Sequence, residues 1–195
     1  MRYAYDVQET QISGGPAWFD SERWDIAATA GREITEDERR RMLQTLLNDR
    51  FRMTIRHDSK ELPVYALVVA KSGSKLTPGT AGNPERVELG VSGAGLHQMR
   101  GQSVPLSTMA KVLTGPSGRI VVDRTGLAGS FDYQLEWVPD PANMPMINGA
   151  KPDGSKLDGA SIFTAVQEQL GLRLEATKGP VEILVIERAE KATEN

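Results

Sequence analysis

The chain has 195 residues, of which 39% are hydrophobic and 25% are charged, a balance typical of a folded globular protein. A formal net charge of -3 provides no general attraction to phosphate backbones or anionic lipid, so nucleic acid is not expected as a partner. Because the sequence contains no cysteine, disulfides and thiolate-based catalytic, zinc or iron–sulfur sites are excluded. The length predicts one domain or two small ones.

The sequence carries no targeting or membrane signal. No apolar run approaches the roughly 18 residues that a membrane-spanning helix needs. Met1 is followed directly by polar sequence where a signal peptide would have its apolar core. Residues 1–7 have the pattern of the last turns of a helix whose beginning is missing, so we expect the natural chain to start further upstream.

Residues 1–70 predict two units, each made of a helix and two strands. In the first unit the helix is truncated, and residues 10–13 predict a short strand that ends at a Gly-Gly-Pro break. Alternation of apolar and polar residues at Trp24, Ile26 and Ala28 predicts the second strand of this unit.

The second unit begins with the clearest helix of the sequence. Thr35 and Glu38 have the spacing of a capping box, which marks a helix start. The buried stripe of this helix is expected to contain Met42, Leu43, Leu46 and Leu47. Residues 51–55 then alternate as a half-buried strand, residues 59–63 predict a turn, and the apolar residues 64–70 predict a central strand.

Residues 71–104 are rich in Gly, Ser, Pro and Thr and predict a variable surface loop region. Only residues 87–91 and 96–99 have the pattern of short strands within it. The sequence GVSGAG at residues 90–95 resembles a phosphate-binding loop, but no Lys-Ser or Lys-Thr pair follows. A flexible turn is therefore the favoured interpretation.

Residues 105–195 predict two further units of a helix and two strands. The first helix has an apolar stripe made of Leu106, Met109, Ala110 and Leu113. Residues 120–137 follow it as a strand, a turn with two glycines, and an alternating strand. The last helix runs from Ser161 at its N-cap to Gly171 at its C-cap, and a turn at residues 178–180 is expected to separate its two strands.

A loop of about 20 residues, 138–159, joins these two units, and loops of this length tend to be functional or mobile. Its apolar residues Met144, Met146 and Ile147 form a partner-binding tip or fold back on the body of the protein. Asp153 and Asp158 are reminiscent of a calcium loop but lack its ligand spacing, so a turn is favoured.

These patterns together predict an α+β fold of repeated helix-strand-strand units, with a mostly antiparallel sheet and helices packed on one face. The expected division is an N-terminal pair of units at residues 1–70, the loop region at 71–104, and a C-terminal pair at 105–195. One such unit cannot bury its own apolar face. We therefore expect one compact domain or two closely packed halves.

No set of residues has the spacing of a complete catalytic, cofactor or metal site, so none is predicted. His57 and His97, the only histidines, would need the fold to bring them together with a carboxylate to bind a metal. Residues 39–41, three arginines, could bind phosphate, but the neighbouring carboxylates indicate a self-neutralised solvated face.

The glycine-rich turn within residues 120–137 offers a second candidate. Asp123, with Thr125, Gly126 and Gly129, could present a carboxylate to a ligand. The structural interpretation is stronger, because Asp and Thr side chains bond turn amides and glycine adopts positive φ. It predicts positive φ or close packing at Gly126, and Phe131 and Tyr133 on one side of the strand. The tryptophans are expected to fill the core rather than to stack a sugar: Trp18, Trp24 and Trp137.

Four stretches of the chain resemble a family of uncharacterised exported proteins that is expanded in soil bacteria of the Acidobacteria type. They are residues 14–28 (GGPAWFDSERWDIAA), 42–71 (MLQTLLNDRFRMTIRHDSKELPVYALVVAK), 121–137 (VVDRTGLAGSFDYQLEW) and 161–195 (SIFTAVQEQLGLRLEATKGPVEILVIERAEKATEN). The resemblance implies a domain of unknown function, without catalytic residues to transfer, and a periplasmic or extracellular location. Members of that family generally begin with a signal peptide and a further N-terminal segment, which we expect to precede Met1 in the natural chain. A weaker analogy exists to the short βαβ modules of secretins and TonB-dependent receptors.

The sequence therefore favours a binding or interaction module without catalysis, whose partner is a protein, a peptide or a glycan. Two alternatives stay open: a cell-envelope hydrolase of polysaccharide or peptide, and a sensor domain of a membrane-associated system. A hydrolase would have a concave pocket with converging carboxylates or a histidine near an acidic group. The residue pattern alone does not state the function.

Overall fold

The computed structural model describes residues 1–140 and 157–192, which form two compact units. Unit 1 contains Met1–Leu62 and Pro180–Asn195, and unit 2 contains Pro63–Gly179. The two boundaries fall inside two long strands, so the chain passes between the units twice in extended conformation. This division differs from the boundaries at residues 70 and 104 that the sequence predicts.

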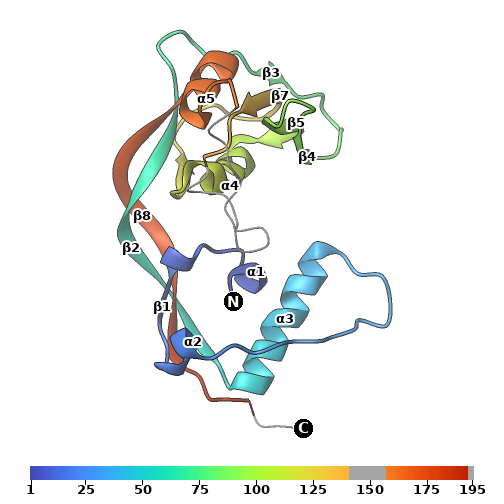
Figure 1. Cartoon of the computed structure of the whole chain (residues 1–195), viewed down its shortest axis with the longest axis vertical. Helices are drawn as coiled ribbons and strands as arrows, with labels where there is room; N and C mark the ends of the chain where they lie inside the picture. The colour runs from blue at the N-terminus through green and yellow to red at the C-terminus, as the bar shows by residue number, and fades with distance from the viewer. Residues whose placement is uncertain (141–156, 193–195) are drawn as a thin grey trace. The chain divides into compact units, whose positions relative to one another are not determined.

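The elements confirm the expected α+β class (Figure 1). Unit 1 has α1 (Arg2–Tyr5), the 3-10 helix η1 (Glu9–Gln11), β1 (Ile12–Gly14), α2 (Trp18–Ser21) and α3 (Glu36–Phe51). Unit 2 has β3 (Thr77–Pro78), β4 (Arg86–Val91), β5 (His97–Pro105), α4 (Leu106–Ser117), β6 (Val121–Asp123), β7 (Ser130–Trp137) and α5 (Ile162–Leu170). The long strands β2 (Thr54–Val69) and β8 (Leu172–Arg188) contribute residues to both.

The strands form two sheets, with the orders β1-β8-β2-β6 and β3-β7-β5-β4. In the second sheet, which lies wholly in unit 2, β7 pairs with β3 and β5, and β4 pairs with β5, all antiparallel. In the first sheet, β1 pairs with β8 and β6 pairs with β2 in parallel. The predicted predominance of antiparallel pairing is confirmed.

The core of unit 2 lies between the second sheet and the helices α4 and α5 (Figure 1). The sheet contributes alternate residues from its inner strands: Met99, Val104, Phe131, Tyr133, Leu135 and Trp137. The helices contribute the predicted stripe of α4 and the apolar face of α5: Leu106, Met109, Ala110, Leu113, Ile162, Ala165, Val166 and Leu170. Successive residues of a strand point to opposite faces, so these alternate residues lie on one face of the sheet. Both helices contact this same face, as expected.

Local interactions fix both helices of unit 2 as the sequence predicts. The Ser161 hydroxyl accepts a hydrogen bond from the Thr164 amide at 3.2 Å, and Gly171 ends α5 with φ of 64°. At the end of α4, the Thr114 hydroxyl donates to the Ala110 carbonyl and accepts from the Val121 amide at 3.0 Å. That last bond ties the helix to the start of β6.

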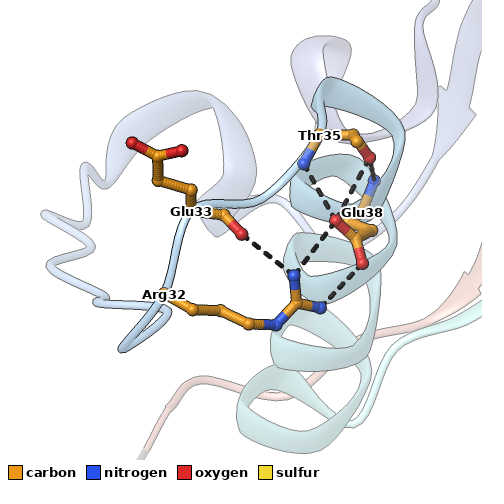
Figure 2. Close-up of polar contacts among 4 residues, drawn as sticks. All are labelled: Arg32, Glu33, Thr35 and Glu38. Carbon is orange, nitrogen blue, oxygen red and sulfur yellow. Dashed lines mark hydrogen bonds and ion pairs between the residues drawn. The ribbon is translucent and has the colours of Figure 1, made fainter.

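The capping box predicted for α3 is present (Figure 2). The Glu38 amide donates to the Thr35 hydroxyl at 3.2 Å, and the Thr35 amide donates to the Glu38 carboxylate at 2.9 Å. Arg32 reaches the same carboxylate at 2.7 Å. α3 packs on the small core of unit 1, formed by Ala4, Leu47, Phe51 and Met53.

Two predictions for unit 1 are wrong. Met42, predicted to lie in the buried stripe of α3, is 46% exposed. The small core of unit 1 covers only part of the apolar stripe of this helix, and Met42 lies outside that part. The strand predicted around Trp24, Ile26 and Ala28 does not form, and this segment pairs with no strand in the described structure. Alternation is a local property, whereas a strand also needs a partner for its backbone groups.

The turns predicted at residues 59–63 and 178–180 are also wrong. β2 and β8 run through both positions as continuous strands, and they are neighbours in the first sheet. Each of the two strands has the other as a hydrogen-bonded neighbour, so polar residues together with Pro63 and Pro180 stay extended. The unit boundaries fall at these two prolines instead.

Residues 120–137 are not the hairpin that the sequence suggests. β6 pairs with β2 in the first sheet, whereas β7 lies in the second sheet between β5 and β3. The connection between them redirects the chain from one sheet to the other. Within residues 71–104, predicted to be a surface loop region, β4 and the inner strand β5 form half of the second sheet.

Candidate functional site

The second sheet presents a polar face on the side away from α4 and α5. We call it the open face. It is formed by Arg86, Glu88 and Gly90 of β4, Gln98, Arg100 and Gln102 of β5, and Asp132, Gln134 and Glu136 of β7. These positions alternate with the core residues of the same strands, so strand periodicity alone places their side chains together.

The strand register arranges these side chains in rows across the sheet. Glu88 lies opposite Arg100, which lies opposite Gln134, and Gln98 lies opposite Glu136. The Arg100 guanidinium donates to the Gln134 side chain at 3.3 Å, and the Gln98 amide donates to the Glu136 carboxylate at 2.6 Å. Each row therefore pairs donors with acceptors, which stabilises the sheet and sets the side-chain positions.

The open face is hollowed above these rows. One hollow of about 490 Å³ is lined by Thr77, Arg86, Glu88, Arg100, Gly101, Gln102, Asp132, Tyr133 and Gln134. A smaller one of about 260 Å³ is lined by Glu88, Leu89, Gly90, Gln98, Met99, Arg100 and Gln134. Glu88, Arg100 and Gln134 border both hollows, so the two adjoin each other, and we call them together the groove.

A β-bulge lies at the end of the groove. The register between β5 and β7 shifts between Gly101 and Val104, and Ser103 adopts a positive φ of 50°. The Ser103 amide donates to the Asp132 carboxylate at 2.7 Å, and its hydroxyl donates to the Thr80 carbonyl at 3.3 Å. A left-handed conformation at a residue other than glycine costs of order 1–3 kcal/mol and is common near functional sites.

Tyr133 closes the floor of the larger hollow. Its ring lies over Gly101, the residue opposite it on β5, and the side chain is 7% exposed. Its hydroxyl oxygen is buried and has no hydrogen-bond partner among the described residues. Burial, and secondarily the charge of Glu85, raise the pKa of Tyr133 well above its usual range, so the hydroxyl stays protonated.

The groove contains two carboxylates, Glu88 and Asp132, which is the feature expected of a hydrolase. In the register they lie two strands and two residues apart, a Cα separation of about 12 Å, with Arg100 and Gln134 between them. Because Asp132 also accepts the Ser103 amide, this arrangement fits hydrogen-bonded recognition better than paired acid and base catalysis.

A family model described as "Protein of unknown function (DUF3738)" matches residues 1–189 of the chain. The chain belongs to the DUF3738 family. This membership confirms the resemblance to a family of uncharacterised proteins. No curated protein and no solved structure matches the DUF3738 chain. None of the helices within residues 1–140 and 157–192 has both the length and the apolar character that crossing a bilayer requires.

The candidate at Asp123 has a structural role in this DUF3738 protein. Its carboxylate accepts hydrogen bonds from the Thr125 amide at 2.9 Å and the Thr125 hydroxyl at 2.8 Å. The Thr125 hydroxyl accepts from the Leu127 amide, and Gly126 has the predicted positive φ, 71°. Phe131 and Tyr133 both pack on the core of unit 2, as predicted. The turn interpretation is confirmed.

The two histidines have separate surroundings. His57 of unit 1 contacts the Glu182 carboxylate through Nδ1 at 2.5 Å, and His97 of unit 2 packs edge-on against Trp137, with ring centroids 5.7 Å apart. In the described parts of the DUF3738 chain, no three His, Asp or Glu side chains form a group able to hold a metal ion. Asp158 is exposed, and Asp153 lies outside those residues.

Two of the three arginines at residues 39–41 form ion pairs with neighbouring carboxylates. Arg39 pairs with Glu36 at 3.0 Å, and Arg40 pairs with Asp6 at 3.1 Å. These ion pairs agree with the expectation of a self-neutralised face. The positions of Met144, Met146 and Ile147 lie outside the described residues, so the partner-binding tip stays a prediction.

The tryptophans divide between core and surface. Trp137 is buried in unit 2, and Trp18 stacks on Phe51 in unit 1 with ring centroids 6.1 Å apart. Trp24, expected in the core, is 41% exposed and meets Phe51 only with an edge-to-face contact. A hollow of about 250 Å³ in unit 1 is lined by Trp18, Trp24 and Phe51, among other residues. It is mainly apolar and lacks the hydrogen-bonding rows of the open face.

Proposed function

We propose that this DUF3738 protein is a non-catalytic binding module that holds an extended segment of a protein or peptide on the open face of unit 2. The observation that supports the proposal is the larger hollow of the groove, of about 490 Å³, in which Arg86, Arg100 and Gln102 lie among Glu88, Asp132 and Gln134. Such a mixture of donors and acceptors complements a peptide, which carries backbone amides and side chains of both charges.

The composition of the groove favours a peptide over the other ligand classes. A glycan site usually offers an exposed aromatic face, whereas Tyr133, the one aromatic residue of this groove, is buried with its ring against Gly101. A nucleic-acid site would concentrate positive charge, whereas the two arginines here alternate with two carboxylates.

We further propose that the protein acts in the periplasm or at the cell surface. The support is the resemblance of the four sequence stretches to exported proteins. Fractionation of cells that express the full-length gene checks this point. Recovery of the protein only from the cytoplasm would contradict it.

A peptide library and a glycan library screened by thermal shift against the full chain would test the binding proposal, because a ligand of the folded state raises the melting temperature. Hits are then measured by calorimetry with wild type and Arg100→Ala. We expect peptide hits whose affinity falls about tenfold or more in Arg100→Ala, since a hydrogen bond to a charged group contributes about 1.5–3 kcal/mol.

Arg173→Ala is the matched control, because Arg173 is an exposed arginine of unit 2 that does not line the groove. The Arg173→Ala variant should bind the peptide hits with the same affinity as wild type. Glycan hits that depend on Arg100, or no hits at all, would contradict the peptide proposal. Turnover of a hit that is lost in Glu88→Gln, with binding retained, would establish the hydrolase alternative instead.

A further inference from the structure

The free edge of β4 supports a second inference, which concerns the backbone pairing of this strand rather than ligand binding in the open-face groove. β4 is the outer strand of the second sheet, and its six residues pair with β5 without interruption, from Arg86 opposite Gln102 to Val91 opposite His97. On its other side, no strand within residues 1–140 and 157–192 pairs with it. A strand edge of this kind presents unpaired backbone donors and acceptors to another chain.

The edge is apolar as well as unpaired. Leu89 is 66% exposed and Val91 is 63% exposed, the two highest values among the large exposed hydrophobic residues that the structure describes. Leu89 lies opposite Met99, which is fully buried, so at this position the buried core ends between β5 and β4, whereas Val87 still packs against the core. An added strand at this edge would place further apolar side chains beside Leu89 and Val91.

β4 has few of the features that usually protect an edge strand. Proteins discourage edge pairing with charged side chains, lysine above all, and with proline, a bulge or a very short strand. β4 contains neither lysine nor proline, its register is unbroken, and its only charges are Arg86 and Glu88 at one end. The bulge of this sheet lies between β5 and β7, away from the free edge.

We propose that β4 pairs antiparallel with β4 of a second copy of this chain, with the twofold axis at Leu89. The sequence of the strand supports this occupant, because Val87, Leu89 and Val91 are spaced symmetrically about Leu89. In this register Val87 lies opposite Val91 of the second copy, and Leu89 lies opposite its equivalent. All three apolar pairs then fall on the face that carries the core.

Electrostatics selects this register over its neighbours. With the axis at Leu89, Glu88 lies opposite Gly90 of the second copy, so no like charges oppose each other. An axis at Glu88 would place the two Glu88 carboxylates directly opposite each other, which is destabilising. An axis at Val87 would pair Arg86 with Glu88, but Leu89 and Val91 would then lie opposite Glu85 and Asn83, outside the strand.

Sedimentation velocity over about 1–500 µM tests the association, since a six-residue edge is a small interface and a weak dimer is expected. The mass of the full chain should rise from 21.3 kDa toward twice that value with concentration. Leu89→Lys should keep the chain monomeric throughout. Met42→Lys, which changes a similarly exposed residue of α3, should associate like wild type.

Engineered cysteines test the register, because the chain has none of its own. Leu89→Cys should form a disulfide-linked dimer under mild oxidation. Val87→Cys or Val91→Cys alone should cross-link poorly, since equivalent residues are about 13 Å apart in this register. An equal mixture of Val87→Cys and Val91→Cys should cross-link efficiently.

A wild-type protein that stays monomeric at every concentration would overturn the proposal and leave an added peptide strand as the occupant of the edge. Association that survives in Leu89→Lys, or that is lost in Met42→Lys, would also overturn it. Efficient cross-linking of Val87→Cys with itself would exclude the register. Thermal unfolding of Leu89→Lys at low concentration should match wild type, which separates loss of pairing from loss of folding.

Discussion

The ring of Tyr133 lies in the space that a side chain at position 101 would need. A β carbon added to Gly101 would be 2.2 Å from Cε1 and 2.3 Å from Cζ of Tyr133. Glycine therefore lets the tyrosine ring cross the β5 backbone, cover the floor of the open-face groove from the core side, and bury its hydroxyl. The two residues act as one packing unit.

Gly101→Ala is expected to destabilise the protein by about 1–3 kcal/mol or more, because the added methyl forces the Tyr133 ring out of its place. Urea unfolding measures the effect. Gly90→Ala is the matched control: Gly90 lies on the neighbouring strand, and nothing lies within 4 Å of its added β carbon. That variant should be more stable by about 0.5–1 kcal/mol. Equal effects of the two substitutions would contradict the packing described.

Tyr133→Phe is expected to change how stability depends on pH. Burial raises the pKa of Tyr133 in the folded protein, whereas the unfolded chain ionises near 10. The folded state thus holds the Tyr133 proton more tightly than the unfolded state does. The free energy of unfolding is therefore unaffected by this group below pH 10 and decreases as the pH rises above 10. The stability of wild type relative to Tyr133→Phe should fall by about 1.4 kcal/mol per pH unit there.

Urea unfolding of both proteins between pH 8 and about 11 measures this difference, with Tyr3→Phe as the control because Tyr3 is 43% exposed. Below pH 10, Tyr133→Phe should equal wild type or be more stable by up to about 1 kcal/mol, since it removes a buried hydroxyl without a partner. A difference between the two proteins that stays constant with pH would contradict the assignment.

Asp123→Ala is expected to cost about 1 kcal/mol of stability and to leave ligand binding at the open face unchanged. The substitution removes the acceptor of the Thr125 amide and hydroxyl in an exposed turn. Asp123→Asn retains an acceptor oxygen and should lose less. Chemical denaturation and calorimetry test the two expectations. A variant with normal stability but impaired binding would restore Asp123 as a functional residue.

Thr35→Ala is expected to weaken α3 by about 1 kcal/mol, because the capping hydroxyl is lost. Arg32→Ala should cost less, since the Arg32–Glu38 pair is exposed (Figure 2). The hydrogen bond from Arg32, and to a smaller extent that from the Thr35 amide, lowers the pKa of Glu38 in the folded protein. The stabilisation from these contacts is therefore present above the usual pKa of a glutamate and is lost as the pH falls below it. Hydrogen exchange of the α3 amides measures both effects; equal protection in the two variants would contradict the ranking.

Features that depend on neighbours within a few residues were predictable from the sequence. The capping box of Thr35 and Glu38, the caps of α5 at Ser161 and Gly171, and the turn held by Asp123 all formed as expected. The apolar stripe of α4 also lies in the core. Each of these depends on hydrogen bonds or spacing inside one element, so the local sequence contains the needed information.

The open face could be predicted only in part. Alternation in residues 131–137 places Asp132, Gln134 and Glu136 on one side of β7. The short strands predicted at residues 87–91 and 96–99 correspond to β4 and the start of β5, but their pattern did not show that both would pair beside β7 and complete the face. The bulge at Ser103 changes the alternation within β5, so that Met99 and Val104 share the core face despite their odd and even numbers. A search of the sequence for strict alternation of apolar and polar residues therefore does not recognise the whole of such a strand.

The sequence by itself determined the cap at the start of α3, both caps of α5, the apolar stripe of α4 and the way the Asp123 turn is held, because these interactions span only a few residues. The tertiary structure decided which strands pair, that β2 and β8 continue through their polar middles, and which polar side chains share the open face. Those outcomes depend on backbone partners far away in the chain, and a segment's own residues do not specify which distant strand satisfies its hydrogen bonds.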